Sequence, residues 1–283
     1  YPYDLVKGEA VSRSLEAGIG DAATARMAAM VGQPSLAAKF AGRARGWRQL
    51  IDPETRLARG RSSTGAWRSP FNPLVPTSPL NNPGDYTEAN AWQYSWTPAL
   101  HDPLGLREVW GGKAGLEAML NRFFFELPHT EGAEYLGQEA MIGQYAHGNE
   151  PSHHIAWLYA FTDHPETGHK LVRKIAGSFY RDDPAGIIGN EDAGQMSAWY
   201  VFATLGFYPL DASSGAYVAG IPLTARARIN VPGRRTLQIE RVGQGDRLTQ
   251  VKIAGQIKET TNLPHHCIVN GGTMRFELGE AKQ

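Results

Sequence analysis

The stretch "GQMSAWYVFATLGFYPL", residues 194–210, marks the point where a helical chain becomes a β-rich one. It is apolar on nearly every side, which predicts a buried helix whose polar start is buried with it. Gly206 and Pro209 end that helix. After about Gly215, short alternating segments bounded by Gly, Pro and Asn predict strands. Helices first and strands afterwards favour two packed modules over a βαβ sheet.

The chain before this stretch is dominated by helical patterns. An Ala-rich segment from Ser12 to Val31 stops at Gly32, and a second helical pattern from about Ser35 to Leu50 completes a hairpin. Residues 51–86 carry many Pro, Gly, Ser and Asn and no period, which predicts a long surface loop. Further helices are expected over Thr87–Trp96, Gly112–Phe125, Pro151–Phe161 and Pro165–Phe179.

Composition excludes several classes of function. The 28 Lys and Arg balance 28 Asp and Glu, so no global field attracts nucleic acid or an anionic membrane. No run of 18 apolar residues predicts a membrane span. Cys267 is the single cysteine, which rules out an internal disulfide and a sulfur metal cage. The chain starts without Met and leads quickly into a helix, so we expect a piece of a longer protein.

Acid and indole side chains come together in "DYTEANAWQYSW", residues 85–96. Trp92 and Trp96 follow Glu88 by four and eight residues, so one helical face is expected to carry all three. Indoles beside a carboxyl group would desolvate it and raise its pKa, as a general acid requires. The alternative is a surface Glu in a first helical turn, where the helix dipole favours it.

A second polar cluster, "AHGNEPSHH", residues 146–154, precedes an apolar run. Helix capping explains one of these polar side chains, but not all of them. Carboxylate, amide and backbone oxygens suit a hard cation such as Ca²⁺. Zinc fits less well, because adjacent histidines point to different helix faces. Capping with a buried His and a metal site both stay open on the residues alone.

The third cluster stands at the start of the helix quoted first. Polar side chains buried there need partners. Asp192 is either a plain N-cap or a general base, and the two roles are compatible because backbone N–H groups would keep it ionised. Two carboxylates in different surroundings, such as Glu88 and Asp192, are what cleavage of a glycosidic bond needs. The cluster comprises Asn190, Glu191, Asp192 and Gln195.

The stretches "YTEANAWQY", "HGNEPSHHIAWLY" and "GNEDAGQMSAWYVFATLGFYP" closely resemble the motifs of glycoside hydrolase family 92, the calcium-dependent exo-acting α-mannosidases. The resemblance covers essentially the whole chain. It implies a mainly α fold, with residues 1–214 as the C-terminal part of an (α/α)₆ toroid and residues 215–283 as a small β-rich tail. Family members also carry an N-terminal β-sandwich, so that sandwich and the remaining toroid helices are the expected partners of this chain.

The resemblance also implies roles for individual residues. Glu88 would be the general acid and Asp192 the general base. Where some members have a second Asp, this chain has Asn190, which makes Glu191 the candidate helper carboxylate. The expected calcium ligands are Asn149, Glu150 and the carbonyl of Gly148, and the expected sugar contacts are Trp92, Gln93, His154 and Asn190.

The implied function is a Ca²⁺-dependent, inverting exo-α-mannosidase that releases mannose from mannose-rich glycans such as N-glycans, with α-1,2 linkages the expected substrate. The resemblance favours an extracytoplasmic protein. The alternative is a carbohydrate-binding protein that uses calcium without hydrolysis. A toroid lyase would need a Tyr or His base near a cluster of Arg, which does not flank these motifs, and a phosphorylase would lack the base carboxylate.

Overall fold

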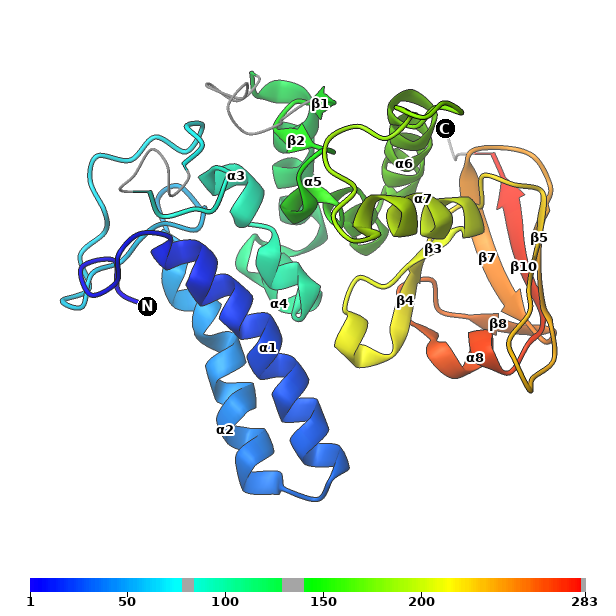
Figure 1. Cartoon of the computed structure of the whole chain (residues 1–283), viewed down its shortest axis with the longest axis horizontal. Helices are drawn as coiled ribbons and strands as arrows, with labels where there is room; N and C mark the ends of the chain where they lie inside the picture. The colour runs from blue at the N-terminus through cyan, green and yellow to red at the C-terminus, as the bar shows by residue number, and fades with distance from the viewer. Residues whose placement is uncertain (78–83, 129–139, 281–283) are drawn as a thin grey trace. The chain divides into compact units, whose positions relative to one another are not determined.

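The computed structural model describes residues 1–77, 84–128 and 140–280, which form two compact units, Tyr1–Ser152 and His153–Gln283. The expected boundary at residue 214 falls inside the second unit. Helices dominate the first unit, and the second combines helices with a β-rich C-terminal region (Figure 1). None of the described helices is long and apolar enough to cross a membrane.

The first unit begins with the predicted hairpin, whose two helices lie side by side (Figure 1). Its first helix ends at Met30, two residues before the predicted Gly32, and its second starts at Pro34, which suits a first helical turn. The described helices of this unit are α1 (Ala10–Met30), α2 (Pro34–Ala44), α3 (Ala91–Tyr94), α4 (Pro103–Val109) and α5 (Gly112–Asn121); the 3₁₀ segments are η1 (Arg45–Leu50), η2 (Thr97–Leu100) and η5 (Glu150–Ser152).

A π-helical turn, η3 (Arg122–Glu126), follows α5 and supports a small hairpin of β1 (Met141–Ile142) and β2 (Tyr145–Ala146). Gly143 in the hairpin turn has a φ of +58°, and a Cβ there would lie 2.4 Å from the carbonyl oxygen of Phe123. Only glycine allows this approach. The Gln144 N–H completes the contact by donating to the same carbonyl at 2.9 Å.

The predicted surface loop over 51–86 has no regular element among its described residues, yet part of it is buried. Isolated bridges join Ile51 to Ala58 and Arg61 to Trp67. Leu57 and Ala58 are buried in the core. The loop is therefore a packed part of the first unit rather than a surface appendage.

The helices of the second unit are α6 (Pro165–Phe179), α7 (Gln195–Leu205) and α8 (His265–Val269), with 3₁₀ segments η6 (Ile155–Phe161) and η7 (Ala212–Ser214). Gly168 lets α6 approach η6, since a Cβ there would lie 2.5 Å from the Ala156 carbonyl oxygen. The expectation that the helix at 194–205 is buried is wrong for this structure. Met196 and Trp199 are buried, but Tyr200 and Val201 are 40 % and 52 % exposed.

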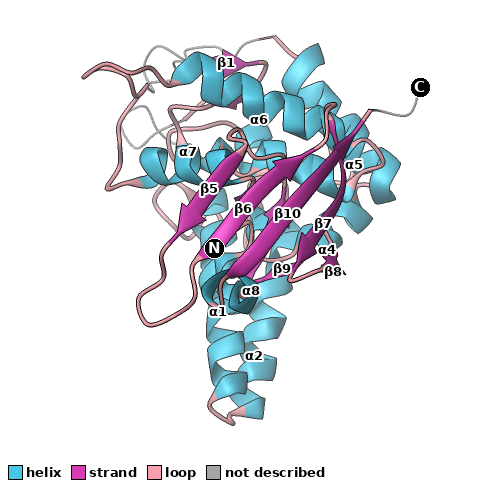
Figure 2. Cartoon of the chain, turned by 90° about the vertical axis from the view of Figure 1, so that its right-hand side faces the viewer, coloured by secondary structure: helices cyan, strands magenta, loops and turns pink. Residues whose placement is uncertain are grey.

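The predicted strands are confirmed. Five form one sheet in the order β5-β6-β10-β7-β8, in which β10 is parallel to β6 and the other pairs are antiparallel (Figure 2). Alternating side chains of this sheet, such as Leu237, Ile239 and Met274, face one apolar core. The bounds are β5 (Arg226–Ile229), β6 (Leu237–Val242), β7 (Arg247–Ile253), β8 (Gln256–Lys258) and β10 (Gly272–Gly279). A second sheet joins β3 (Phe207–Tyr208), β4 (Ala216–Ala219) and β9 (Leu263–Pro264).

Candidate active site

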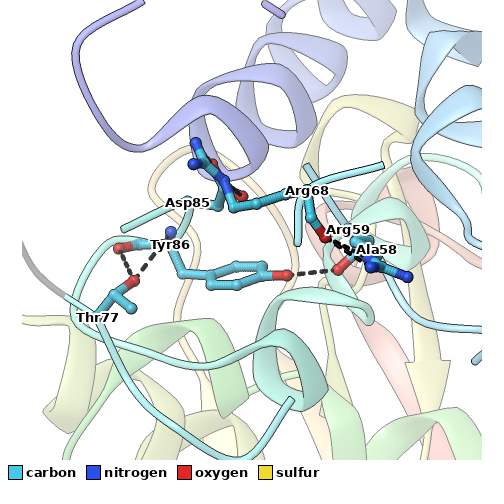
Figure 3. Close-up of polar contacts among 6 residues, drawn as sticks. All are labelled: Ala58, Arg59, Arg68, Thr77, Asp85 and Tyr86. Atoms are coloured by element: carbon cyan, nitrogen blue, oxygen red, sulfur yellow. Dashed lines mark hydrogen bonds and ion pairs between the residues drawn. The ribbon is translucent and has the colours of Figure 1, made fainter. Parts of the chain in front are cut away.

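Buried polar contacts hold Asp85 and Tyr86, shortly before Glu88 in the chain (Figure 3). Asp85 is 4 % exposed and forms a two-pronged ion pair with the Arg68 guanidinium, whose Nη2 lies 2.7 Å from Oδ1. The Tyr86 hydroxyl donates to the Ala58 carbonyl at 2.6 Å, and its backbone N–H donates to Thr77 Oγ1 at 3.1 Å. These contacts fix the backbone immediately before the expected general acid.

Glu88 lies before helix α3, not within it. Its backbone has a φ of +48°, a left-handed conformation that is uncommon for a residue with a side chain. Asn90 is the N-cap, since its side chain accepts from the Gln93 N–H while the Gln93 side chain accepts from the Asn90 N–H. The expected helix over Thr87–Trp96 is therefore wrong at its start, because the capping box begins the helix at Ala91.

The expected desolvation of Glu88 by indoles is not found in this chain. Glu88 is exposed. Trp96 is fully buried in an aromatic cluster, where its ring centroid lies 4.5 Å from that of Trp110 and 5.4 Å from that of Phe123. Trp96 is thus a core residue, and the Glu88 carboxyl group is presented to solvent on a rigid backbone.

Trp92 and Gln93, the expected sugar contacts next to Glu88, are both buried. The Arg122 guanidinium stacks over the Trp92 ring at 5.2 Å from its centroid. The Gln93 amide bonds at both ends within the protein, because Oε1 accepts from the Asn90 N–H and Nε2 donates to the Gln144 carbonyl at 3.1 Å. Here Gln93 supports the start of α3, and its contact with a sugar stays a prediction.

Asn149 links the second polar cluster to the Glu88 loop. Its side chain is 7 % exposed, and its Nδ2 donates to the Glu88 backbone carbonyl at 2.8 Å. A carbonyl oxygen only accepts hydrogen bonds, so this contact fixes which end of the amide is nitrogen. The amide oxygen Oδ1 points the other way and accepts no hydrogen bond from any residue that the structure describes.

The residues beside Asn149 offer oxygen atoms of the kind that bind a hard cation. Glu150 and Gly148 are half-buried neighbours that offer a carboxylate and a backbone carbonyl. Together with Asn149 Oδ1 they form an oxygen set of the kind that Ca²⁺ takes. Within residues 1–77, 84–128 and 140–280, no group of three or more His, Cys, Asp and Glu could hold a metal ion. These oxygen types suit a hard cation, and their assignment to calcium stays a prediction.

The two histidines that follow begin the second unit and are both buried. They separate η5 from η6, so the expected helix over Pro151–Phe161 is two 3₁₀ segments instead. His153 Nδ1 lies 3.2 Å from Gln195 Nε2, and its carbonyl accepts from the Trp199 indole N–H at 3.0 Å. His154 is 1 % exposed. His153 is a structural anchor for α7, and a sugar contact by His154 stays a prediction.

The loop before α7 shows which carboxylate bonds to the start of this helix, while the expected roles of Asp192 as base and Glu191 as helper stay predictions. Gly194 is the N-cap residue, and the Glu191 carboxylate, not that of Asp192, accepts from the backbone N–H groups of Gly194 and Ser197. Hydrogen bonds from Ser197, first through its hydroxyl and then through its N–H, and from the Gly194 N–H lower the pKa of Glu191. Asp192 is exposed, with a φ of +52°, and Asn190 is exposed beside it.

Glu88 and Asp192 therefore share an uncommon backbone state. Both are non-glycine residues in the left-handed region, and both side chains are exposed. Such conformations cost about 1–3 kcal/mol each, and this structure also has them at Glu9, Arg56, Ala140, Ala193 and Ala254. Neither conformation was predictable from the residue types, since glycine is the residue that usually marks it.

Two cavities lie apart from these residues. One of about 690 Å³ in the first unit is lined by α1, η1 and the loop near Arg61, including Asp21, Arg43 and Trp47. Another of about 480 Å³ in the second unit is lined by Tyr180, Ile187, Tyr200 and Val201. Neither includes an expected site residue.

Sequence reasoning missed two residues that hold the site together. Gln144 accepts from Asn90 Nδ2 at 2.7 Å through its side chain and from Gln93 through its carbonyl. Arg122 covers the Trp92 ring. Both lie far in sequence from the stretch 85–96 that they contact, and no periodicity relates them to it.

Comparison with known families gives one match over almost the whole chain. The model of the glycosyl hydrolase family 92 catalytic domain matches residues 1–280. A fungal protein named uncharacterized secreted glycosidase, from Arthroderma benhamiae, is 25 % identical over 206 residues, which are 71 % of this chain and 24 % of that protein.

Solved structures that resemble this chain include members of the same family. A family GH92 α-mannosidase from Bacteroides thetaiotaomicron, in complex with mannoimidazole, superposes with a TM-score of 0.89 at 32 % identity, covering 98 % of this chain and 37 % of that one. A GH92 inverting mannosidase from the same species gives a TM-score of 0.82 at 29 % identity, covering 98 % and 38 %. The chain thus spans well under half the length of the relatives it matches.

Proposed function

The chain belongs to glycosyl hydrolase family 92, and from this premise we propose that it supplies the catalytic carboxylates of a calcium-dependent, inverting exo-α-mannosidase. The substrate is a mannose-containing glycan with terminal α-linked mannose, α-1,2 linkages included. The similar bacterial proteins named α-mannosidase and inverting mannosidase support this choice. The observation that carries it is the contact of Asn149 with Glu88, because it joins the expected cation ligand to the expected acid.

In the proposed reaction Glu88 is the general acid. Its exposed carboxyl group, on a backbone fixed at both sides, protonates the glycosidic oxygen as the bond to the anomeric carbon breaks. Asp192 is the general base and takes a proton from a water that attacks the opposite face of the sugar. Inversion follows because the water enters opposite to the leaving group. Glu191, which is occupied at the start of α7, takes no proton in this scheme.

The cation would be held by Asn149 Oδ1, the Glu150 carboxylate and the Gly148 carbonyl. When bound, calcium supplies positive charge that binds sugar hydroxyls and orients the ring. Trp92, Gln93, His154 and Asn190 are the proposed neighbours of the sugar. Of these, Asn190 is exposed, whereas Trp92, Gln93 and His154 are buried.

We place the helices of this chain in part of an (α/α)₆ toroid, with the β-rich segment from residue 215 as its tail. The partners are then the other toroid helices and an N-terminal β-sandwich. The relatives' greater length supports this arrangement. A relative named a secreted glycosidase supports an extracytoplasmic location.

The test is mannose release from α-1,2-mannobiose in the presence of calcium, with binding of the disaccharide measured in parallel. Wild-type protein should release mannose, and Glu88→Gln should bind the disaccharide but release almost none. Binding without release by the wild type would identify a calcium-dependent carbohydrate-binding protein instead. The assay is run on the 283-residue chain and on any longer native polypeptide that contains it.

A further inference from the structure

The side chain of Asn149 has two ends with different surroundings. Nδ2 is bonded to the Glu88 carbonyl at 2.8 Å, and Oδ1 has no hydrogen-bond donor among the described residues. The amide is planar, so a force that orients one end orients the other. We propose that Asn149 is a positioning residue that couples cation binding to the placement of the general acid. This inference rests on the proposed function and adds to it a link between two parts of the site.

The Glu88 backbone needs such a hold. Its left-handed conformation is unfavourable for a residue with a side chain. On one side, the Thr87 N–H donates to Ser12 Oγ at 2.7 Å, and on the other, the Ala89 carbonyl accepts from the Thr77 N–H at 3.0 Å. Between these two contacts lies the Glu88 carbonyl, and Asn149 binds it. Asn149 is therefore the contact that holds the carbonyl of the acid itself.

The chemistry of the amide sets the direction of the coupling. A cation at Oδ1 draws electron density toward that oxygen and makes the Nδ2 protons better donors. The bond to Glu88 should therefore strengthen when the cation binds. An acid displaced by about 1 Å loses on the order of 10²-fold in rate, so a modest shift of this backbone has a large effect.

The substitution Asn149→Asp tests the two ends of the side chain separately. It keeps an oxygen ligand and adds a negative charge, so calcium affinity should be equal to or tighter than that of the wild type. It also places an oxygen against the Glu88 carbonyl, where two acceptors repel. Turnover of substrates with poor leaving groups should fall on the order of 10²-fold at saturating calcium, with a much smaller loss on an activated aryl mannoside.

Glu150→Gln is the matched control. It removes a charged ligand but leaves the contact to Glu88 intact. Calcium should bind more weakly, and at saturating calcium the dependence on leaving group should be that of the wild type. If Asn149→Asp retained the wild-type dependence on leaving group, or if both variants changed it alike, the coupling would be wrong. A wild type without mannosidase activity would instead refute the proposed function.

A measurement on the wild type does not depend on how the variants fold. Peptide-level hydrogen exchange over residues 85–93 is compared with and without calcium, with binding monitored by calorimetry. Calcium should slow exchange in this segment, where the Asn90 N–H donates to Gln93. The peptides of strand β6, which belongs to the second unit, serve as the control and should not change. Calcium binding without added protection over 85–93 would overturn the proposal.

Discussion

Arg68 and Asp85 face each other in a two-pronged ion pair, with Asp85 almost completely buried. Removal of one partner from such a pair leaves an uncompensated charge. Asp85→Asn should therefore lower the free energy of unfolding by about 3 kcal/mol. Lys170→Ala, which breaks an ion pair with side chains 60 % and 42 % exposed, should cost much less, because solvent screens exposed charges. Chemical denaturation of both variants measures the difference, and equal losses would contradict the bracing role of Arg68 and Asp85.

Glu191 provides a second prediction, which separates helix capping from catalysis. Its pKa is lowered in the folded state, so it stabilises the fold above its ordinary value of 4.5. That contribution is lost as the pH falls below 4.5 through the folded pKa. Glu191→Gln should therefore unfold at a lower temperature than the wild type at pH 7, and the gap should narrow toward pH 3.5.

Asp192→Asn is the control for Glu191. Asp192 does not cap α7, so this variant should keep the wild-type melting temperature at pH 7 while losing turnover. A Glu191→Gln variant with unchanged stability and lost activity would instead identify Glu191 as a helper carboxylate in the reaction.

Much of the fold was predictable from local pattern. The first hairpin follows from an Ala-rich period and a terminating glycine, and α1 lies within two residues of the predicted bounds. The strands after residue 215 were predictable from short alternating segments bounded by Gly, Pro and Asn. The parallel pairing of β10 with β6 was not predictable, because strand pairing depends on contacts between residues distant in sequence.

The site was less predictable, because its details depend on contacts that no period encodes. The helix start at Ala91 results from the pairing of Asn90 with Gln93, which competes with a longer helix. The interruption at His153 and His154 was hidden by the apolar run that follows. Asp192 is not the N-cap because α7 starts only at Gln195, with Gly194 at the cap position, and the Glu191 carboxylate bonds to the helix start instead.

Removal of calcium should abolish turnover, because Asn149, Glu150 and the Gly148 carbonyl grip a sugar poorly without the ion. Activity is measured with excess chelator and again after calcium is restored, and circular dichroism checks that the fold is kept. Full activity in chelator, with no metal found by elemental analysis, would remove calcium from the proposal.

The two carboxylates should differ in their dependence on leaving group. Glu88→Gln should cripple hydrolysis of mannosides with poor leaving groups, on the order of 10²–10⁴-fold, and largely spare an activated aryl mannoside that needs little protonation. Asp192→Asn should slow both substrates alike, because water activation is needed for each. If the two variants showed the same pattern in steady-state kinetics, the roles of acid and base would have to be withdrawn.

Inversion is the central claim, and the anomer of the first sugar released tests it most directly. A water placed between the sugar and Asp192 requires the Glu88 and Asp192 carboxyl groups to lie about 6.5–9.5 Å apart, against about 5–5.5 Å in a retaining enzyme. Proton NMR of a reaction started on an α-mannoside should show β-mannose first, with α-mannose growing in only by mutarotation. Initial release of α-mannose would mean that Asp192 acts as a nucleophile and would contradict the account.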